Sequence, residues 1–526
     1  MPGLGSILPR PARGRAGRGS VLAALVLLVA VVAVATALVV RDAGRQGPPG
    51  TVTPPAATIS GVGAAQAHVS VAAGATPVIV PRSFLGISTE YWTIPVWGAH
   101  LPLLNRVLSL LSADGPLRLR IGGDSADSVF WAPVKELPEW VFELTPAWLT
   151  QVSRLVRLAH VRLILDLNLV TATPQVAARW ARTAEAKLPR GSIIAFEIGN
   201  EPDIYSQSSW RQRVTGPTAR RLPTQITATS YARAYASYAR ALAQAAPGVP
   251  LLAPALAEPQ KNSSWVAKLL AAPHPGLTGV TAHRYPYSAC SRPGTATFPT
   301  IARVLSENAT AGLARTALSV EKVSDRAKLP LWLTEINSVT CGGTRGVSNT
   351  YATALWAPDA LLELVKAGVE SASIHVRHNA INMAFSLTRR GLVAHPLLYG
   401  MILFARTLGP GAQLLPLQVN APSAAHLKAW AVQINGGIVH VLLLDKGGRP
   451  AQIRLSLPSA VGVGTVQRLL APSVASTSHV TLGGQRLGAD GAWHGTPSHE
   501  TIAPGPDGYR VTLPRYSAAL LTLHLR

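Results

Sequence analysis

Residues 193–203 read IIAFEIGNEPD, a short apolar run that ends in glycine, asparagine and glutamate. A second stretch of the same kind, residues 332–337, reads WLTEIN. In each stretch a pattern typical of a buried β-strand is followed directly by a carboxylate side chain. Because parallel α/β folds carry their working groups at the carboxyl ends of strands, these two stretches guide the interpretation of the remaining sequence.

The sequence around them alternates short β-branched or leucine-rich runs with longer amphipathic stretches, the pattern of βα units around a parallel sheet. Helical patterns include residues 146–159, 174–187, 229–246 and 351–366. Repeated βα units predict a closed (β/α)8 TIM barrel, of the α/β class, over residues 84–408. The expected strands are Phe84–Ser88, Leu117–Gly122, Arg162–Leu167, Ile193–Ile198, Pro250–Ala255, Leu277–Ala282, Leu329–Leu333 and Ser371–Val376.

The character of the sequence changes after the barrel region. Residues 426–433, 437–444, 451–457, 509–513 and 518–525 alternate apolar and polar side chains between turn signals. This predicts a C-terminal antiparallel β-sandwich over residues 409–526. Residues 66–83 are also strand-like, so this segment can pair with the β domain rather than with the barrel.

The N-terminal region differs in composition from the rest. Residues 1–20 are basic, with four arginines, and an uninterrupted apolar run follows at residues 21–40. This run is long enough to span a bilayer, and the positive charges before it predict a cytoplasmic N-terminus with the remaining chain outside. A retained signal-anchor is favoured, with a flexible linker at residues 41–65. Secretion after cleavage near Ala37 is the alternative, because Ala35 and Ala37 form an A-x-A site.

The chain carries 48 Lys and Arg against 25 Asp and Glu, a formal net charge of +23. This excess suits nucleic acid, an anionic lipid surface or an acidic polysaccharide, or it reflects arginine spread over a solvated surface. A nucleic-acid partner is not expected, because no nucleic-acid-binding motif focuses the charge. The sequence leaves the oligomeric state open.

Two glutamates stand at expected strand ends, Glu201 after strand four and Glu335 after strand seven. Glycosidic cleavage needs such a pair, one carboxyl protonated for the leaving oxygen and one ionised at the anomeric carbon. A separation of roughly 5 to 5.5 Å gives direct attack and retention, whereas a wider gap admits water and inverts. We expect Glu201 to be the acid/base, its pKa raised by burial and a nearby negative charge. Surface ion pairs are the alternative interpretation of both residues.

Five short strings carry a specific resemblance. They are RIGGDS at residues 120–125, NEP at 200–202, HRY at 283–285, TE at 334–335 and CGG at 341–343. Together they resemble glycoside hydrolase family 79, the β-glucuronidase and heparanase family of the clan A barrels, from Phe84 to the C-terminus. The resemblance implies a retaining double displacement with Glu335 as nucleophile and Glu201 as acid/base. It also implies action on β-linked glucuronic acid, or a related uronic acid, in extracellular glycans or glycoconjugates.

Further site residues follow from the same chemistry and resemblance. Asn200 would donate to a sugar 2-hydroxyl, and Tyr285 would hydrogen-bond the nucleophile unless it only covers the barrel rim. Substrate hydroxyls would contact Asp124 and Asp127, which are otherwise helix caps. The remaining two candidates are Gly342 and Gly343. Their backbone N–H groups would hold the uronate carboxylate, unless the two glycines form an ordinary turn.

One departure from the family pattern concerns the sugar. The family usually has a tyrosine near the end of strand eight that completes the carboxylate site, and here residues 382–385 read NMAF. A clan A glycosidase for a neutral sugar, arabinofuranosidase-like or xylosidase-like, therefore stays an alternative. A non-catalytic glycan-binding barrel is another.

The two cysteines, Cys290 and Cys341, follow strands six and seven. In an oxidising compartment we expect them to form a disulfide at the catalytic face. Three histidines lack the grouped spacing of a metal site: His283, His375 and His378. Neither a metal nor a cofactor is expected.

Overall fold

The computed structural model describes residues 64–526 except 73, 132–140, 208–225, 423–424 and 458. The predicted membrane segment at residues 21–40 lies outside the described residues, as does the linker before residue 64. Within the described part of the chain, no helix combines the length and the apolar character that crossing a bilayer requires.

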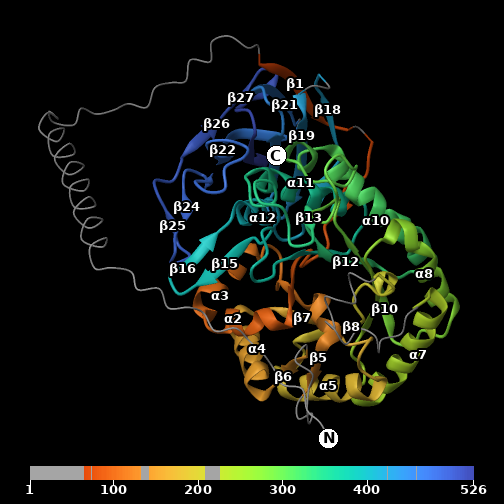
Figure 1. Cartoon of the computed structure of the whole chain (residues 1–526). Coiled ribbons are helices and arrows are strands. Elements are labelled where there is room, and N and C mark those ends of the chain that lie inside the picture. The colour runs from red at the N-terminus through yellow and green to blue at the C-terminus, as the bar shows by residue number, and fades with distance from the viewer. Residues whose placement is uncertain (1–63, 73, 132–140, 208–225, 423–424, 458) are drawn as a thin grey trace, which may run out of the picture. The chain divides into compact units, whose positions relative to one another are not determined.

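The predicted eight-stranded barrel is confirmed (Figure 1), with the strands closed in the order β10-β12-β14-β3-β4-β7-β8-β9. In chain order they are β3 (Leu85–Glu90), β4 (Arg118–Gly122), β7 (Arg162–Leu167), β8 (Ile193–Ile198), β9 (Leu251–Leu256), β10 (Leu277–Arg284), β12 (Leu331–Ile336) and β14 (Ser371–His375). Strands β10 and β12 run further than expected, so His283 and Glu335 belong to the strands themselves.

Helices surround the barrel, and several begin where the sequence predicts. Thr145 and Thr173 cap α4 and α5 by accepting hydrogen bonds from backbone N–H groups in the first turn, and a proline follows each cap. The described helices of two turns or more are α3 (Leu101–Leu111), α4 (Pro146–Ala159), α5 (Pro174–Lys187), α7 (Ala228–Ala245), α8 (Pro259–Ala271), α10 (Ala311–Ser324), α11 (Ala352–Lys366) and α12 (Pro396–Thr407). The shorter helix α2 is Ile94–Gly98, and α9 is Ile301–Val304.

The C-terminal part forms two packed sheets. The larger has the order β2-β17-β19-β20-β29-β22-β23, with β26 on β22, and the smaller has the order β18-β1-β21-β28-β27. The strands are β1 (Ala65–Val71), β2 (Val78–Ile79), β17 (Gln413–Leu415), β18 (Leu417–Asn420), β19 (Leu427–Ile434), β20 (Ile438–Asp445), β21 (Ala451–Ser456), β22 (Ala460–Leu470), β23 (Thr481–Leu482), β26 (Glu500–Ile502), β27 (Pro504–Gly505), β28 (Gly508–Leu513) and β29 (Ser517–Leu525). Strand β1 pairs in parallel with β21, so the segment before the barrel is part of the β domain, and the sheets are not purely antiparallel.

The other strands in the described part of the chain form short two-stranded sheets. They are β5 (Val129–Trp131) with β6 (Phe142–Leu144), β11 (Tyr287–Ser288) with β13 (Val339–Thr340), β15 (Phe385–Thr388) with β16 (Gly391–Ala394), and β24 (Arg486–Leu487) with β25 (Trp493–His494). The pair β11 and β13 joins the loops that follow β10 and β12.

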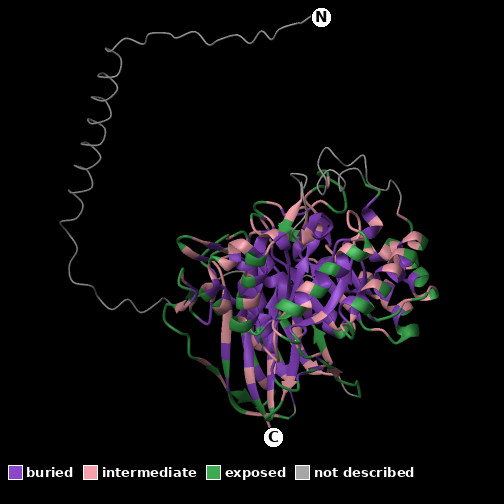
Figure 2. Cartoon of the chain, turned by 90° about the horizontal axis from the view of Figure 1, so that it is seen from below, coloured by how far each residue is buried: buried purple, intermediate pink, exposed green. Residues whose placement is uncertain are grey.

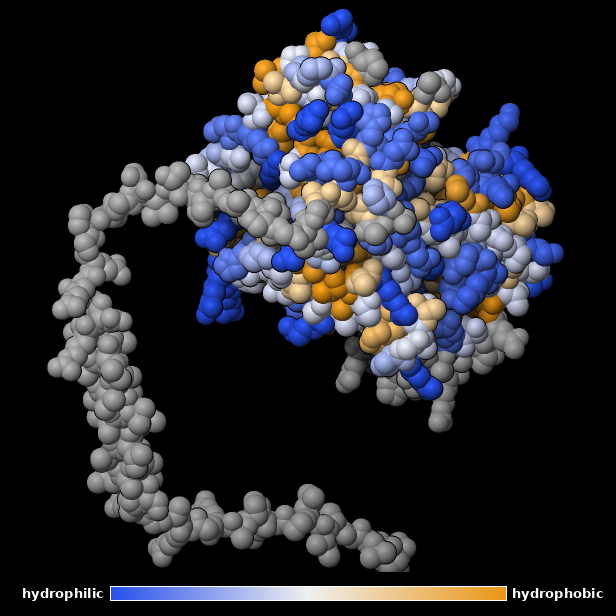
Figure 3. Space-filling view, turned by 90° about the horizontal axis from the view of Figure 1, so that it is seen from above, coloured by the Kyte–Doolittle hydropathy of each residue, from blue (hydrophilic) through white to orange (hydrophobic). Residues whose placement is uncertain are grey.

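One hydrophobic core runs from the barrel into the β domain (Figure 2). It includes Trp356 and Leu361 of α11 as well as Trp430 and Leu442 of the β domain. A second core lies between the two sheets. On the face seen in Figure 3, hydrophilic residues are spread among apolar ones rather than gathered in one block.

Candidate active site

Glu201 and Glu335 meet at one end of the barrel. One carboxylate oxygen of each lies within 4.8 Å of the other and of a ring nitrogen of His283. Glu335 lies in β12, while Glu201 follows β8 and adopts left-handed backbone angles, φ 53° and ψ 49°. Such angles are uncommon for a residue with a Cβ atom and are found preferentially at functional sites. The two side chains are therefore close enough to act on one substrate bond.

Glu335 is almost fully buried and is held by cationic and hydroxyl groups. Its Oε2 accepts a hydrogen bond of 3.0 Å from Arg120 Nη1, and its Oε1 accepts one of 2.6 Å from the Tyr285 hydroxyl. Burial alone would raise the pKa of Glu335, but the surrounding charges and this hydroxyl lower the pKa to about 2. The carboxylate is therefore ionised at neutral pH, as a nucleophile requires.

Arg120 organises the interior of the site. Its guanidinium is fully buried and donates to Glu197 at 2.6 Å, to Asp166 at 2.9 Å and to Glu335 at 3.0 Å. One cation cannot compensate three buried carboxylates. Burial raises the pKa of Asp166 well above its ordinary value, against the effect of Arg120. The pKa of Asp166 is thus shifted in the direction opposite to that of Glu335.

The Glu201 carboxylate contacts a neutral imidazole. His283 Nδ1 lies 3.0 Å from Glu201 Oε1, and burial lowers the pKa of His283 to about 4. The ring is therefore uncharged at neutral pH, and it shares a hydrogen bond with the Glu201 carboxyl group. Glu335 thus contacts a guanidinium and a tyrosine hydroxyl, whereas the contacts of Glu201 include the imidazole of His283.

Asn200 and Tyr285 lie where the sequence predicts. Arg120 Nη2 donates to Asn200 Oδ1 at 2.9 Å, which fixes the amide and leaves its Nδ2 group as the donor. Tyr285 follows β10 and contacts Glu335 as described above. Asp124 is partly exposed in the first turn of the short helix Gly123–Ser128 that follows β4.

Two predicted contacts need correction. Asp127 has no exposed surface, because its carboxylate accepts hydrogen bonds from the Tyr205 hydroxyl at 2.8 Å and from Leu169 N at 3.3 Å. It supports the loop instead of facing a substrate. Gly343 N donates to Thr340 O at 3.2 Å within the turn, so this N–H is not available to a ligand.

Gly342 keeps the predicted position, with a φ of 77° that suits glycine. Its carbonyl accepts hydrogen bonds from Ile381 N and Asn382 N, in the loop after β14. A disulfide between Cys290 and Cys341 joins the loop after β10 to the loop after β12. Three loops, after β10, β12 and β14, are thus fastened together beside Glu335.

Sequence reasoning missed the roles of Arg120 and His375. Arg120 lies in an apolar strand, where a buried arginine requires anionic partners, and this signal was present in the sequence. His375 Nδ1 lies 3.4 Å from Glu335 Oε2, and its own pKa is raised by Glu335 and Glu90 although burial alone would lower it. Nothing in the local sequence indicates this contact.

Glu201, His283 and Glu335 have the spacing of a metal site. Glu335, however, already accepts from Arg120 and Tyr285, and a metal ion would compete with the guanidinium charge. These three side chains therefore suit acid–base chemistry better than metal binding.

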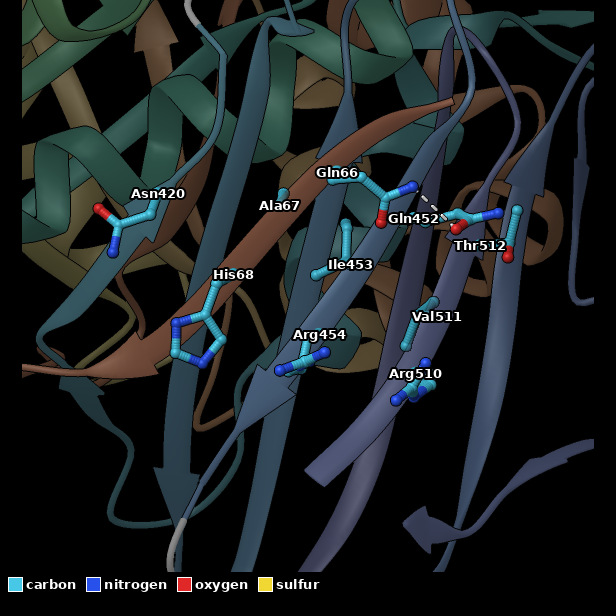
Figure 4. A pocket seen from close by; sticks show the side chains of 10 residues that line it. All are labelled: Gln66, Ala67, His68, Asn420, Gln452, Ile453, Arg454, Arg510, Val511 and Thr512. Carbon is cyan, nitrogen blue, oxygen red and sulfur yellow. Dashed lines mark hydrogen bonds between the residues drawn. The ribbon is translucent and has the colours of Figure 1, made fainter. Parts of the chain in front are cut away.

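A cavity on the smaller sheet of the β domain differs from this site in the side chains that line it (Figure 4). This cavity of about 540 Å³ is lined by amide and cationic side chains, among them Gln66, His68, Gln452, Arg454 and Arg510. Its lining holds no carboxylate, so it lacks the groups for glycosidic cleavage.

Comparisons with known proteins agree with this fold. Residues 429–520 match the family model described as the glycosyl hydrolase family 79 C-terminal beta domain. A search of the curated proteins gives no match. Among solved structures, a 4-O-α-L-rhamnosyl-β-D-glucuronidase from Fusarium oxysporum 12S is similar, with a TM-score of 0.68 and 18% identity over 87% of this chain and 100% of that chain.

Two further solved structures share the fold. A family 51 α-L-arabinofuranosidase from Bifidobacterium longum has a TM-score of 0.64 and 17% identity, over 87% of this chain and 99% of that one. The family 44 endoglucanase Cel44A from Clostridium thermocellum has a TM-score of 0.58 and 13% identity, over 88% and 100%. The resemblance to family 79 is supported over residues 429–520, which match that family's C-terminal β domain, and the fold of the chain is similar to the folds of these solved glycosidases.

Proposed function

We propose that this chain is a retaining hydrolase that removes β-linked glucuronic acid, or a related uronic acid, from glycans or glycoconjugates. The observation that carries the proposal is the pair of glutamates whose oxygens lie within 4.8 Å, with Glu335 held by Arg120 and Tyr285. This spacing is close to that of retaining enzymes and leaves little room for a water between the two carboxyls.

In the first step Glu335 attacks the anomeric carbon while Glu201 gives its proton to the glycosidic oxygen. The bond between that carbon and oxygen breaks, and the sugar is held as an ester on Glu335. Tyr285 and Arg120 orient the attacking carboxylate through the hydrogen bonds described above. In this proposal the amide of Asn200 donates to the 2-hydroxyl of the sugar, with its oxygen held by Arg120.

In the second step Glu201, now ionised, takes a proton from a water molecule. The water oxygen attacks the anomeric carbon, the ester bond to Glu335 breaks, and the sugar leaves with its original configuration. The neutral state of His283 suits this role, because Glu201 must gain and lose a proton in each cycle.

Support for a uronic acid comes from the family 79 match and from the similar Fusarium oxysporum enzyme, which is a glucuronidase. The proposed location is the outer face of a membrane, with the segment at residues 21–40 as anchor, or the medium after cleavage near Ala37. The disulfide suits an oxidising compartment.

A neutral-sugar glycosidase is the second candidate. It is favoured by the similarity to arabinofuranosidases and by the sequence NMAF at residues 382–385, which lacks the tyrosine of the family pattern. A barrel that binds glycans without cleaving them is the third, and both carboxylates argue against it.

A panel of aryl glycosides tests these candidates: glucuronide, xyloside and arabinofuranoside, with wild type, Glu335→Gln and Glu201→Ala. We expect release from the glucuronide, and a loss of at least about 10³-fold in kcat for Glu335→Gln. Glu201→Ala should keep more activity with a good leaving group, which needs no proton, and azide should accelerate it. Glu185→Gln on α5 is the matched control and should behave as wild type.

Release from the neutral glycosides alone would favour the second candidate. No release from any of them would favour the glycan-binding barrel. Full activity of Glu335→Gln would refute its role as nucleophile.

A further inference from the structure

Arg377 lies two residues after the end of β14 and reaches toward the glycine turn beside Glu335. A Cβ atom built on Gly342 would lie 3.0 Å from Arg377 Nη2, so the guanidinium lies directly against this turn. Any side chain at Gly342 would displace the arginine, and the φ of 77° already disfavours one.

The loops that carry the two residues are braced against each other. Gly342 O accepts from Ile381 N at 2.7 Å and from Asn382 N at 3.2 Å. Asn337 Nδ2 donates to His375 O at 3.1 Å and to Asn382 O at 3.0 Å. The position of Arg377 is thus built into the site and does not depend on a free loop.

No anion compensates Arg377 within the described part of the chain, although its side chain is only partly exposed. Other arginines near barrel strands have carboxylate partners, as Arg118 does with Glu370 at 3.1 Å. A partly buried guanidinium without an acceptor retains its full capacity to bind a planar anion through two hydrogen bonds.

The charge of Arg377 also acts on the reacting end of the site. Burial and the Glu335 carboxylate raise the pKa of Tyr285, and the Arg377 charge opposes this rise. Arg377 is therefore within electrostatic reach of the hydroxyl that holds Glu335, on the side of the Gly342 turn.

We propose that Arg377, with the Gly342 N–H beside it, binds the carboxylate of a uronic acid whose anomeric carbon faces Glu335. This rests on the proposed hydrolase function and names the residue that selects its sugar. In this proposal Arg377 contacts the carboxylate in place of the tyrosine that residues 382–385 lack. A neutral sugar offers nothing for the guanidinium to pair with, so the residue discriminates by charge.

Turnover of aryl β-glucuronide and aryl β-xyloside by wild type, Arg377→Gln and Arg377→Lys tests the proposal. The xyloside has the same ring without the carboxylate. Arg377→Gln should lower kcat/KM for the glucuronide by about 10- to 100-fold, mainly through KM, and leave that for the xyloside unchanged. Arg377→Lys should restore part of the loss, and the exposed Arg390→Gln is the control for removing one charge.

An equal effect of Arg377→Gln on both substrates, or none on the glucuronide, would overturn the role of Arg377 and leave the hydrolase function intact. Preference of wild type for the xyloside would overturn the uronate selection. Calorimetric binding of glucuronate and of xylose to Glu335→Gln, with and without Arg377→Gln, needs no turnover. If Arg377→Gln leaves glucuronate binding unchanged in this measurement, the proposal is overturned even if the chain hydrolyses none of the glycosides.

Discussion

Among single residues, Arg120 connects the buried acidic groups of the site. It pairs with Asp166, Glu197 and Glu335 in an interior from which water is excluded. The pKa of Asp166 is raised, mainly by burial, whereas the pKa of Glu335 is lowered by the charges around it, so Glu335 is the more acidic of the two. His283, which is uncharged at neutral pH, contacts Glu201 in the same site.

Replacing Tyr285 by Phe removes the 2.6 Å hydrogen bond to Glu335. A hydrogen bond to a charged group is worth about 1.5–3 kcal/mol, so kcat should fall by about 10- to 100-fold. The pKa of Glu335 should rise, which moves the acidic limb of the rate profile to higher pH. Steady-state rates from pH 3 to 8 check this, and an unchanged profile with full kcat would exclude the contact from catalysis.

Asp127 gives a prediction about stability. Burial raises its pKa from 3.8 to about 8, so between these values the folded state binds a proton that the unfolded state has released. The free energy of unfolding should therefore fall as the pH rises through this window, by up to about 1.4 kcal/mol per pH unit. Asp127→Asn should lack this contribution. Urea titrations at several pH values measure the difference, and parallel curves for both proteins would contradict the buried neutral acid.

The residues that the sequence could identify are those that a local pattern marks. Glu201 and Glu335 end or follow apolar strands, and Tyr285 belongs to a short recognisable string. The contacts of Arg120, His375 and Arg377 join residues far apart in the chain, such as Arg120 and Glu335, so only the closed barrel brings them together. The Asp127 and Gly343 errors have a similar cause, because hydrogen bonds to Tyr205 and Thr340 occupy groups that the sequence left free.

At the scale of elements, the site depends on three connected loops after β10, β12 and β14. The pair β11 and β13, the disulfide and the amides of Asn337 and Asn382 cross-link them. The periodicity of the sequence predicted every barrel strand but ended β10 and β12 early. The reason is that His283 and Glu335 are polar yet point into the barrel, where Arg120 and Glu201 compensate them.

Removing the disulfide tests this bracing. The bridge closes a segment with a sequence separation of 51 residues, and its loss should cost roughly 2–4 kcal/mol of unfolding free energy. Cys290→Ser with Cys341→Ser should also raise KM, because the Gly342 turn loses one of its supports. Denaturant unfolding and steady-state kinetics measure both effects. Wild-type stability and KM in the double variant would show that the amide contacts suffice.

At the scale of the whole molecule, the barrel and the β domain are held by a buried ionic contact. Lys446, after β20, lies 2.7 Å from Asp359 of α11, and Trp430 of β19 donates to the same carboxylate at 3.0 Å. The positive charges of Lys446 and Lys428 lower the pKa of Asp359 although burial would raise it. Since the core is continuous across this boundary, the two parts should unfold together.

Replacing Asp359 by Ala leaves Lys446 buried without its partner and should cost about 3–5 kcal/mol. Scanning calorimetry should show one transition for wild type and one, at a lower temperature, for the variant. Changing both residues to Leu and Met should recover much of the loss, since no charge is then left uncompensated. Two transitions, only one of which moves, would mean that the domains are independent.

The central claim is that Glu335 attacks the sugar directly while Glu201 supplies the proton. Proton NMR of the first product released from an aryl β-glucuronide, recorded before mutarotation, tests this most directly. We expect the β-anomer first, with the α-anomer appearing later as the sugar equilibrates. The α-anomer as first product would mean that water attacks across a wider gap, and would contradict the assignment of Glu335 as nucleophile.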